Sequence, residues 1–156
     1  MQLLVAAVGQ RMPPWVNEAW HDYRRRMPAV IALTLREVPL GKRTKNADTT
    51  RLVAEESRAL VAAVPARARR VVLDIRGRRW STRELSRRLE FWMADGRDVG
   101  FMIGGPDGID SAIVAESDER WSLGPLTLPH PLVRIVVAEQ LYRAWTITQH
   151  HPYHRA

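Results

Sequence analysis

Apolar residues recur along the chain at two spacings, one typical of strands and one typical of helices. Continuous apolar runs at 2–8, 70–75 and 99–103 predict buried strands, and an alternating run at 30–38 predicts another. A further short buried strand is predicted around Trp121. Because unbroken apolar runs are typical of strands covered on both faces, they favour a parallel sheet.

The segments between the predicted strands have helical spacing and recognisable ends. Prolines, capping residues and glycines predict helices between Pro13 and Met27, between Asp48 and Pro65, between Ser81 and Gly96, and from near Ser111. Strand and helix therefore alternate along the whole chain with short connections. We expect one α/β domain over residues 1–156, with a mostly parallel sheet and helices on both of its faces.

The last 36 residues predict a long helix followed by a polar tail. Arg134, Glu139, Arg143 and Gln149 are expected to lie off the apolar stripe of this helix. Its tail, residues 149–155, gathers histidines, a tyrosine and an arginine, whereas disordered tails are usually poor in aromatic residues. We therefore expect the tail to be functional. The predicted stripe consists of Leu132, Val133, Val136, Val137, Leu141, Ala144, Trp145 and Thr148.

Composition narrows the possible partners. The 24 Lys and Arg residues against 17 Asp and Glu residues give a net charge of +7, which favours a polyanionic partner, nucleic acid before membrane. No apolar run approaches the roughly 20 residues of a membrane span, and no signal peptide is recognised at the start. The chain has no cysteine, which excludes disulfides and thiolate metal sites. We expect a cytoplasmic protein that uses neither membrane nor metal.

Three loops are expected at the edge of the sheet where ligands bind in parallel α/β folds. They follow Asp74, span 104–108 and span 121–129. Gly104 and Gly105 would allow backbone to approach a ligand, or they only connect strand to helix. Neither a GxGxxG nor a GxxxxGK[ST] pattern occurs, which disfavours a nucleoside triphosphatase. The apolar, proline-flanked run at 123–128 predicts a pocket for an aromatic or adenosine-like group.

Several unusual segments carry a resemblance that covers the chain from end to end. They are AVG at 7–9, GKRTKNAD at 41–48, LDIRG at 73–77, DGRDV at 95–99, IGGPDG at 103–108, LTLPHPLVR at 126–134, LYRAWTIT at 141–148 and HPYHR at 151–155. With these segments the chain resembles the RlmH family, the pseudouridine N3-methyltransferases of large-subunit ribosomal RNA, within the SPOUT class. The resemblance implies a C-terminal trefoil knot, which hydrophobic periodicity does not reveal.

The resemblance also implies a cofactor and its site. S-adenosylmethionine is expected to lie bent against the knot, held largely by backbone. The positions that match the family's cofactor site are Leu73, Gly104, Gly105, Leu123, Gly124, Pro125, Leu126, Thr127 and Leu128. No metal is needed, because the sulfonium already makes the methyl group electrophilic.

The acceptor that the resemblance implies is N3 of a pseudouridine in helix 69 of the large-subunit RNA. Arg155 and Arg143 can hold phosphate or stabilise developing negative charge, and Tyr153 can stack on the base or hydrogen-bond to it. His130 titrates near neutrality and can take the N3 proton, or it is only a turn residue between two prolines. Tyr153 alternatively only anchors the tail.

RNA recognition is expected from two basic segments together with the tail. The candidate residues are Arg24, Arg25, Arg26, Lys42, Arg43 and Lys45. The three arginines alternatively only cap a helix, and the lysines belong to a loop that is alternatively only solvated.

The family's quaternary structure supplies further expectations. We expect a homodimer in which the tail of one subunit completes the site of the other, acting on assembled ribosomes near the subunit interface. Two alternative functions remain open. One is a SPOUT methyltransferase of another RNA such as tRNA, and the other is a non-catalytic ribosome-binding module.

Overall fold

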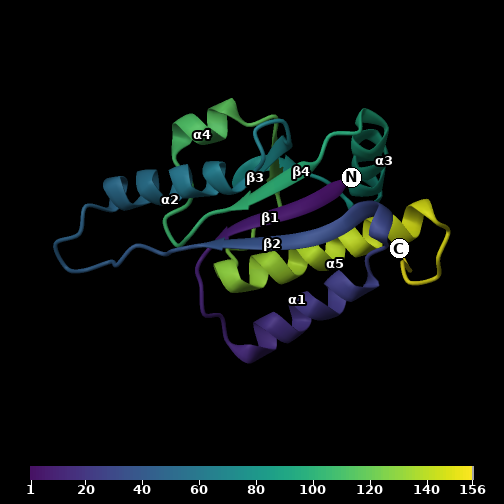
Figure 1. Ribbon diagram of the computed structural model, residues 1–156, viewed down its shortest axis with the longest axis horizontal. Coiled ribbons are helices and arrows are strands. Elements are labelled where there is room, and N and C mark those ends of the chain that lie inside the picture. Colours follow the sequence, from purple (N-terminus) through teal and green to yellow (C-terminus); the bar gives the residue numbers. More distant parts are fainter. Residues whose placement is uncertain (156) are drawn as a thin grey trace.

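Parallel strands form one sheet in the order β2-β1-β4-β3-β5 in the computed structural model, which describes residues 1–155 (Figure 1). The strands are β1 (Gln2–Val8), β2 (Ala32–Val38), β3 (Arg69–Arg79), β4 (Val99–Ile103) and β5 (Glu119–Ser122). Every pairing between these strands is parallel, so the predicted α/β class is confirmed.

Helices cover both faces of the sheet. They are α1 (Pro14–Arg26), α2 (Thr49–Ala63), α3 (Thr82–Asp95), α4 (Ser111–Glu116) and α5 (His130–Thr148). Helices α1, α3 and α5 pack on one face, while α2 and α4 pack on the other (Figure 1). None of these helices is long and apolar enough to cross a membrane.

Strand β1 explains how one apolar run serves both faces. Leu3, Val5 and Ala7 join the core beneath α1, α3 and α5, whereas Leu4, Ala6 and Val8 join the core beneath α2 and α4. Successive side chains of a strand point to opposite faces, so a strand covered on both sides needs an apolar residue at every position. The strand predicted at 2–8 is therefore confirmed, with the central position that such a run favours.

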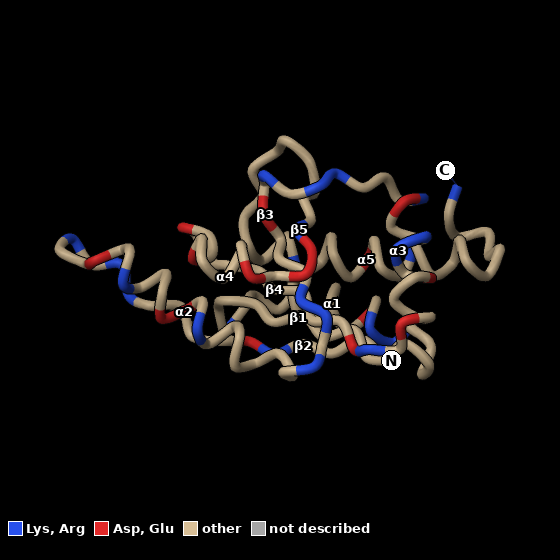
Figure 2. The backbone as a smooth tube through the Cα atoms, turned by 90° about the horizontal axis from the view of Figure 1, so that it is seen from above, with Lys and Arg blue, Asp and Glu red and all other residues tan. Residues whose placement is uncertain are grey.

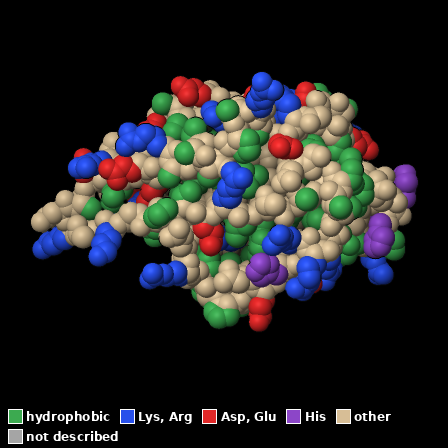
Figure 3. All heavy atoms as spheres, viewed as in Figure 1, with side chains coloured by type: hydrophobic (Ala, Val, Ile, Leu, Met, Phe, Trp, Pro, Cys, Tyr) green, Lys and Arg blue, Asp and Glu red, His purple; other side chains and the backbone are tan. Residues whose placement is uncertain are grey.

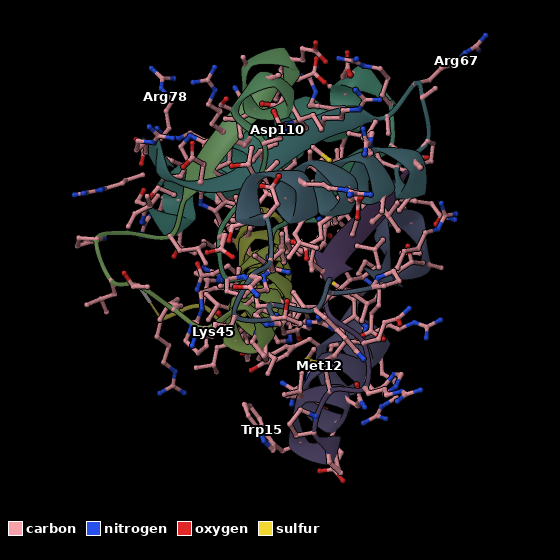
Figure 4. The ribbon with its side chains drawn as sticks, turned by 90° about the vertical axis from the view of Figure 1, so that its left-hand side faces the viewer. Met12, Trp15, Lys45, Arg67, Arg78 and Asp110 are labelled. Atoms are coloured by element: carbon pink, nitrogen blue, oxygen red, sulfur yellow. The ribbon has the colours of Figure 1, made fainter. Side chains whose placement is uncertain are left out.

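Two predicted elements differ at their ends. Strand β2 begins at Ala32 and not at residue 30, because a 3₁₀ turn over Ala29–Ile31 precedes it. Strand β3 extends to Arg79 and not only to residue 75, because its charged end pairs with β5. In α1, Trp15 points outward and is 53% exposed (Figure 4), while Val16 and Trp20 form the buried face.

The residues that helix α5 buries also differ from the predicted apolar stripe. Arg134, expected off the stripe, is completely buried, whereas Leu132, Val136 and Trp145 are only partly buried. The Arg134 Nη1 atom lies 2.5 Å from a carboxylate oxygen of Glu37, and Nη2 donates to the Gly9 carbonyl at 3.2 Å. A buried guanidinium requires such partners, and β1 and β2 supply them from elsewhere in the chain.

Candidate functional site

A cavity of about 290 Å³ lies beside the middle of β3 and at the carboxyl ends of β4 and β5. Its lining comes from the middle of β3, from the glycine loop at 104–108 and from the segment at 123–128. The loop expected after Asp74 is instead part of β3, whose pairing with β5 is irregular between Leu73 and Arg78. The lining residues are Leu73, Asp74, Ile75, Gly105, Pro106, Gly108, Trp121, Leu123, Gly124, Leu126, Thr127, Leu128 and Val133. Seven of the nine predicted cofactor positions are therefore among them, and Gly104 and Pro125 are their chain neighbours.

The glycine loop is a tight turn with a steric reason for its first glycine. The Gly108 amide donates to the Gly105 carbonyl at 3.1 Å, and Gly108 has a φ of 80°. A Cβ atom at Gly104 would lie 2.8 Å from the backbone of Gly108, whereas one at Gly105 would meet only side-chain atoms, at 3.2 Å or more. The turn itself thus requires glycine at 104, and the cavity is lined by Gly105.

The 123–128 segment presents apolar side chains toward a site that is open to solvent. Leu126 is 76% exposed, the largest exposed fraction among the large apolar side chains of the described residues. The Gly124 amide donates to the Ser122 hydroxyl at 3.2 Å, and Gly124 has a φ of 122° that other residues rarely adopt. An apolar wall with a few polar groups is typical of a site for an organic ligand.

The basic loop at 39–48 is tied to the glycine loop through Arg43. The Arg43 Nη2 atom donates to Glu56 at 2.9 Å, Nη1 contacts the same buried carboxylate, and Nε donates to Asp107 at 3.1 Å. The hydrogen bond to Glu56 is the main cause of a raised pKa at Arg43. Of the three predicted RNA-binding cations of this loop, Arg43 is held by carboxylates, whereas Lys42 and Lys45 are exposed, and Figure 4 labels Lys45.

His130 is the first residue of α5, and its ring lies against Gly9. A Cβ atom at Gly9 would be 2.9 Å from the His130 ring, and the buried Nδ1 atom has no hydrogen-bond partner within the described part of the chain. Burial lowers the pKa of His130 below its ordinary value, and the Arg134 guanidinium lowers it further, against opposing effects of the Val8 backbone and of Glu56. The imidazole is therefore neutral at pH 7 and able to accept a proton.

This lowered pKa predicts that acid destabilises the fold through His130. The unfolded chain binds a proton at His130 more readily than the folded chain, so stability is complete above the unfolded pKa of about 6.5 and falls as the pH drops through the folded value. We expect the urea midpoint, followed by tryptophan fluorescence, to decrease from pH 7.5 to pH 5.5. The decrease should be smaller in His130→Gln, and an equal decrease in both proteins would contradict the assignment.

The tail folds back onto the C-terminal end of α5. The Tyr153 hydroxyl donates to Glu139 at 3.3 Å, its ring lies 4.7 Å from the Tyr142 ring, and the Arg143 guanidinium lies 4.9 Å from its centroid. Burial, together with the Tyr23 hydroxyl and the Glu139 charge, raises the pKa of Tyr153 to about 12. Tyr153 is therefore a hydrogen-bond donor at neutral pH. Arg155 is exposed.

The predicted catalytic residues are spread along α5 and the tail. His130 is the first residue of α5, while the Arg143 guanidinium lies over the Tyr153 ring and the Tyr153 hydroxyl donates to Glu139 in the middle of the helix. Glu139 is nine residues from His130, which corresponds to roughly 14 Å along the helix, so within one chain the Tyr153 hydroxyl is not in contact with His130. In Figure 3 tail histidines appear at the end opposite the basic loop.

The arginines that end α1 share the tail's end of the molecule. Arg26 pairs with Asp22 at 2.9 Å, and its guanidinium lies 5.9 Å from the Tyr142 ring of α5. Arg24 and Arg25 are exposed, with Arg25 3.7 Å from Asp22. The two predicted RNA-binding segments are thus far apart in one chain. No cluster of His, Asp or Glu suited to a metal ion occurs among residues 1–155.

Comparisons with known proteins concern the family and the fold of the chain. Residues 1–154 match a family described as predicted SPOUT methyltransferase. Over 155 residues the chain is 52% identical to proteins of Pseudomonas fluorescens and Azotobacter vinelandii named ribosomal RNA large subunit methyltransferase H, with 99% of this chain and 100% of each relative covered. A probable methylase family protein from Haemophilus influenzae has a similar fold, with a TM-score of 0.60 at 11% identity over 99% of this chain and 70% of that one.

Proposed function

The chain belongs to the SPOUT methyltransferase family and is a methyltransferase of large-subunit ribosomal RNA, and on this premise we propose its cofactor, its acceptor and the roles of its residues. The methyl donor is S-adenosylmethionine. The acceptor is N3 of a pseudouridine in helix 69 of the assembled ribosome, near the subunit interface. The protein works in the cytoplasm.

One observation carries the cofactor assignment. Three segments that are separated in the sequence, the middle of β3 and the loops that follow β4 and β5, converge on one cavity. Its leucines, Ile75 and Val133 suit the flat adenine, and Asp74 places a carboxylate where a cationic ligand gains from it. The juxtaposition of 104–108 with 123–128 also supports the trefoil knot expected from the family.

When bound, S-adenosylmethionine supplies a methyl group that its sulfonium makes electrophilic. The residues of the chain hold the base in line with the sulfur–carbon bond, and this positioning supplies much of the rate. Transfer forms the N3–carbon bond, breaks the sulfur–carbon bond and releases the N3 proton. Tyr153 donates a hydrogen bond to the base, and Arg143 and Arg155 stabilise the negative charge that develops as the proton leaves.

His130 has a chemical role and a structural role. It is neutral at pH 7, so it can accept the proton. It also packs against Gly9 and anchors the start of α5 directly after the 123–128 segment. Lys42 and Lys45 on the basic loop, and Arg24, Arg25 and Arg26 at the end of α1, contact RNA phosphates, while Arg43 holds its loop in place.

A homodimer joins the two halves of the site. Because the Tyr153 hydroxyl is held at Glu139, roughly 14 Å along α5 from His130, a second copy supplies Tyr153 and Arg155 to the site. Leu132, Val136 and Trp145 on α5 are apolar yet only partly buried, which supports an isologous contact along this helix.

The test is transfer of labelled methyl from S-adenosylmethionine to ribosomes that lack the modification, followed by nucleoside digestion and mass spectrometry. We expect labelled 3-methylpseudouridine from the large subunit, and much slower transfer to an isolated helix 69 fragment. Label in tRNA or in another nucleoside would identify a SPOUT methyltransferase of another RNA. No label and no binding of S-adenosylmethionine would favour a non-catalytic ribosome-binding module.

Gly104→Ala is expected to weaken binding of S-adenosylmethionine at least tenfold by calorimetry. A Cβ atom there meets the Gly108 backbone at 2.8 Å, so the loop must move. Gly105→Ala is the matched comparison, since its Cβ meets side-chain atoms and no backbone, with Leu40 and Val8 at 3.2 Å and Glu56 at 3.4 Å. Equal affinities of the two variants would contradict the steric argument.

A further inference from the structure

We propose that a second hollow beside the cofactor cavity binds the sugar-phosphate backbone of the RNA next to the methylated base. This arginine groove has a volume of about 420 Å³ and is lined by Arg76, Arg78, Trp80, Arg88 and Arg120, with Asp118 and Glu119. None of these arginines belongs to the two basic segments singled out from the sequence. The inference rests on the proposed function, because it names the surface that presents the RNA to that site.

An irregularity in β3 places the groove next to the cavity. Both Leu73 and Arg78 are in register with Trp121 of β5, so residues 74–77 loop out of the sheet. A Cβ atom at Gly77 would lie 2.7 Å from the Arg120 backbone, which makes glycine necessary for this close approach. Asp74 and Ile75 line the cofactor cavity, while the residues from Arg76 to Arg78 line the groove. An RNA strand in the groove therefore passes directly beside the methyl donor.

Three of the four arginines of the groove face solvent, while Arg88 is partly buried and pairs with Glu119. The Arg76 side chain is 83% exposed, and Arg78 and Arg120 are also exposed. Figure 4 shows Arg78 projecting from the molecule, and Figure 2 shows basic positions recurring from the end of β3 toward α3.

The two carboxylates do not cancel this outward charge. Glu119 is nearly buried and accepts from Trp92 Nε1 at 2.8 Å, while Arg69 and Arg88 pair with it. Asp118 accepts from the Arg70 amide at 2.8 Å, although it keeps its charge at the rim. What the groove offers to a partner is therefore mainly guanidinium groups, which bind phosphate oxygens in pairs.

An aromatic ring among the cations favours a nucleic acid over an acidic protein. Trp80 stacks on Trp121, with ring centroids 5.6 Å apart and an interplanar angle of 27°, and the Arg88 guanidinium lies 5.7 Å from the Trp80 ring. The ring is thus fixed in place and partly exposed. Unpaired nucleotides are bound by combining stacking surfaces with cations for their phosphates.

The test compares Arg78→Gln/Arg120→Gln with Arg58→Gln/Arg67→Gln, which removes the same charge from exposed sites outside the groove. Binding to unmodified ribosomes is measured from 50 to 200 mM salt, with S-adenosylmethionine affinity measured on the free proteins. We expect the groove variant to bind ribosomes about tenfold more weakly, with the slope of log affinity against log salt reduced in magnitude by about 2. Its cofactor affinity should stay within twofold of the wild type.

The outcomes separate this inference from the proposed function. If the wild type methylates ribosomes and the groove and control variants bind them equally well, the groove does not contact RNA. If the wild type transfers no methyl group, the proposed function fails whatever the groove does. A photoreactive residue in place of Arg78 should crosslink to ribosomal RNA, and a crosslink to a ribosomal protein instead would overturn the choice of RNA as the partner.

Discussion

Arg155→Ala is expected to lower the rate of methyl transfer to ribosomes by about a hundredfold or more while leaving the affinity for S-adenosylmethionine unchanged. Loss of one group that stabilises developing charge typically has an effect of about 10²–10³ on the rate. Arg155 is exposed on the tail and is not among the residues that line the cavity of its own chain, so its removal should not disturb cofactor binding. Single-turnover kinetics and calorimetry measure the two quantities separately. Equal losses in both would indicate a damaged fold.

Mixing Arg155→Ala with Gly104→Ala, at a concentration of S-adenosylmethionine that leaves the Gly104→Ala cavity mostly empty, shows which subunit supplies the tail. A dimer of one Arg155→Ala chain and one Gly104→Ala chain has one cavity that is intact and that faces an intact tail from its partner. Random mixing should therefore restore about a quarter of the wild-type activity. If the tail acted on its own chain, the mixture would stay inactive.

Arg134→Ala is expected to lower the free energy of unfolding by about 3 kcal/mol. The substitution leaves a void, removes the partner of the Gly9 carbonyl and leaves Glu37 unpaired, with 29% of its side chain exposed. Urea unfolding followed by tryptophan fluorescence at a fixed protein concentration measures the change.

Exposed pairs supply the control for that measurement. Arg51 pairs with Glu55 on the solvent side of α2 at 3.0 Å, and Arg51→Ala should cost less than about 0.5 kcal/mol. Similar losses for Arg134→Ala and Arg51→Ala would show that the buried pair adds nothing beyond a surface pair.

The local signals in the sequence predicted most of the fold because they act over a few residues. The capping box of Ser81 and Glu84 is present, Asp48 caps α2, and Gly96 ends α3 in a left-handed conformation. The buried position of Arg134 could not be predicted in the same way. Its partners lie in β1 and β2, and hydrophobic spacing along one helix carries no information about them.

The candidate site was predictable to a similar extent. Two of its three segments, the loops that follow β4 and β5, could be chosen because carboxyl ends of parallel strands meet at one edge. The Arg43–Glu56 contact was missed, although Glu56 lies four residues from both Leu52 and Leu60, and a carboxylate in line with apolar residues indicates a buried partner. The exposed arginines at the end of β3 were missed because a run of charged residues lacks the apolar pattern from which a strand is predicted. The structure nevertheless pairs this run with β5.

Because cavity and tail lie apart along α5, the specific activity is expected to depend on the concentration of the protein. Under the proposed arrangement, a solitary subunit carries both halves of a methylation site and has no means of joining them. The fraction of active enzyme then follows the dimerisation equilibrium, so a folded monomer does not methylate RNA. Dimerisation must therefore precede the modification of any base.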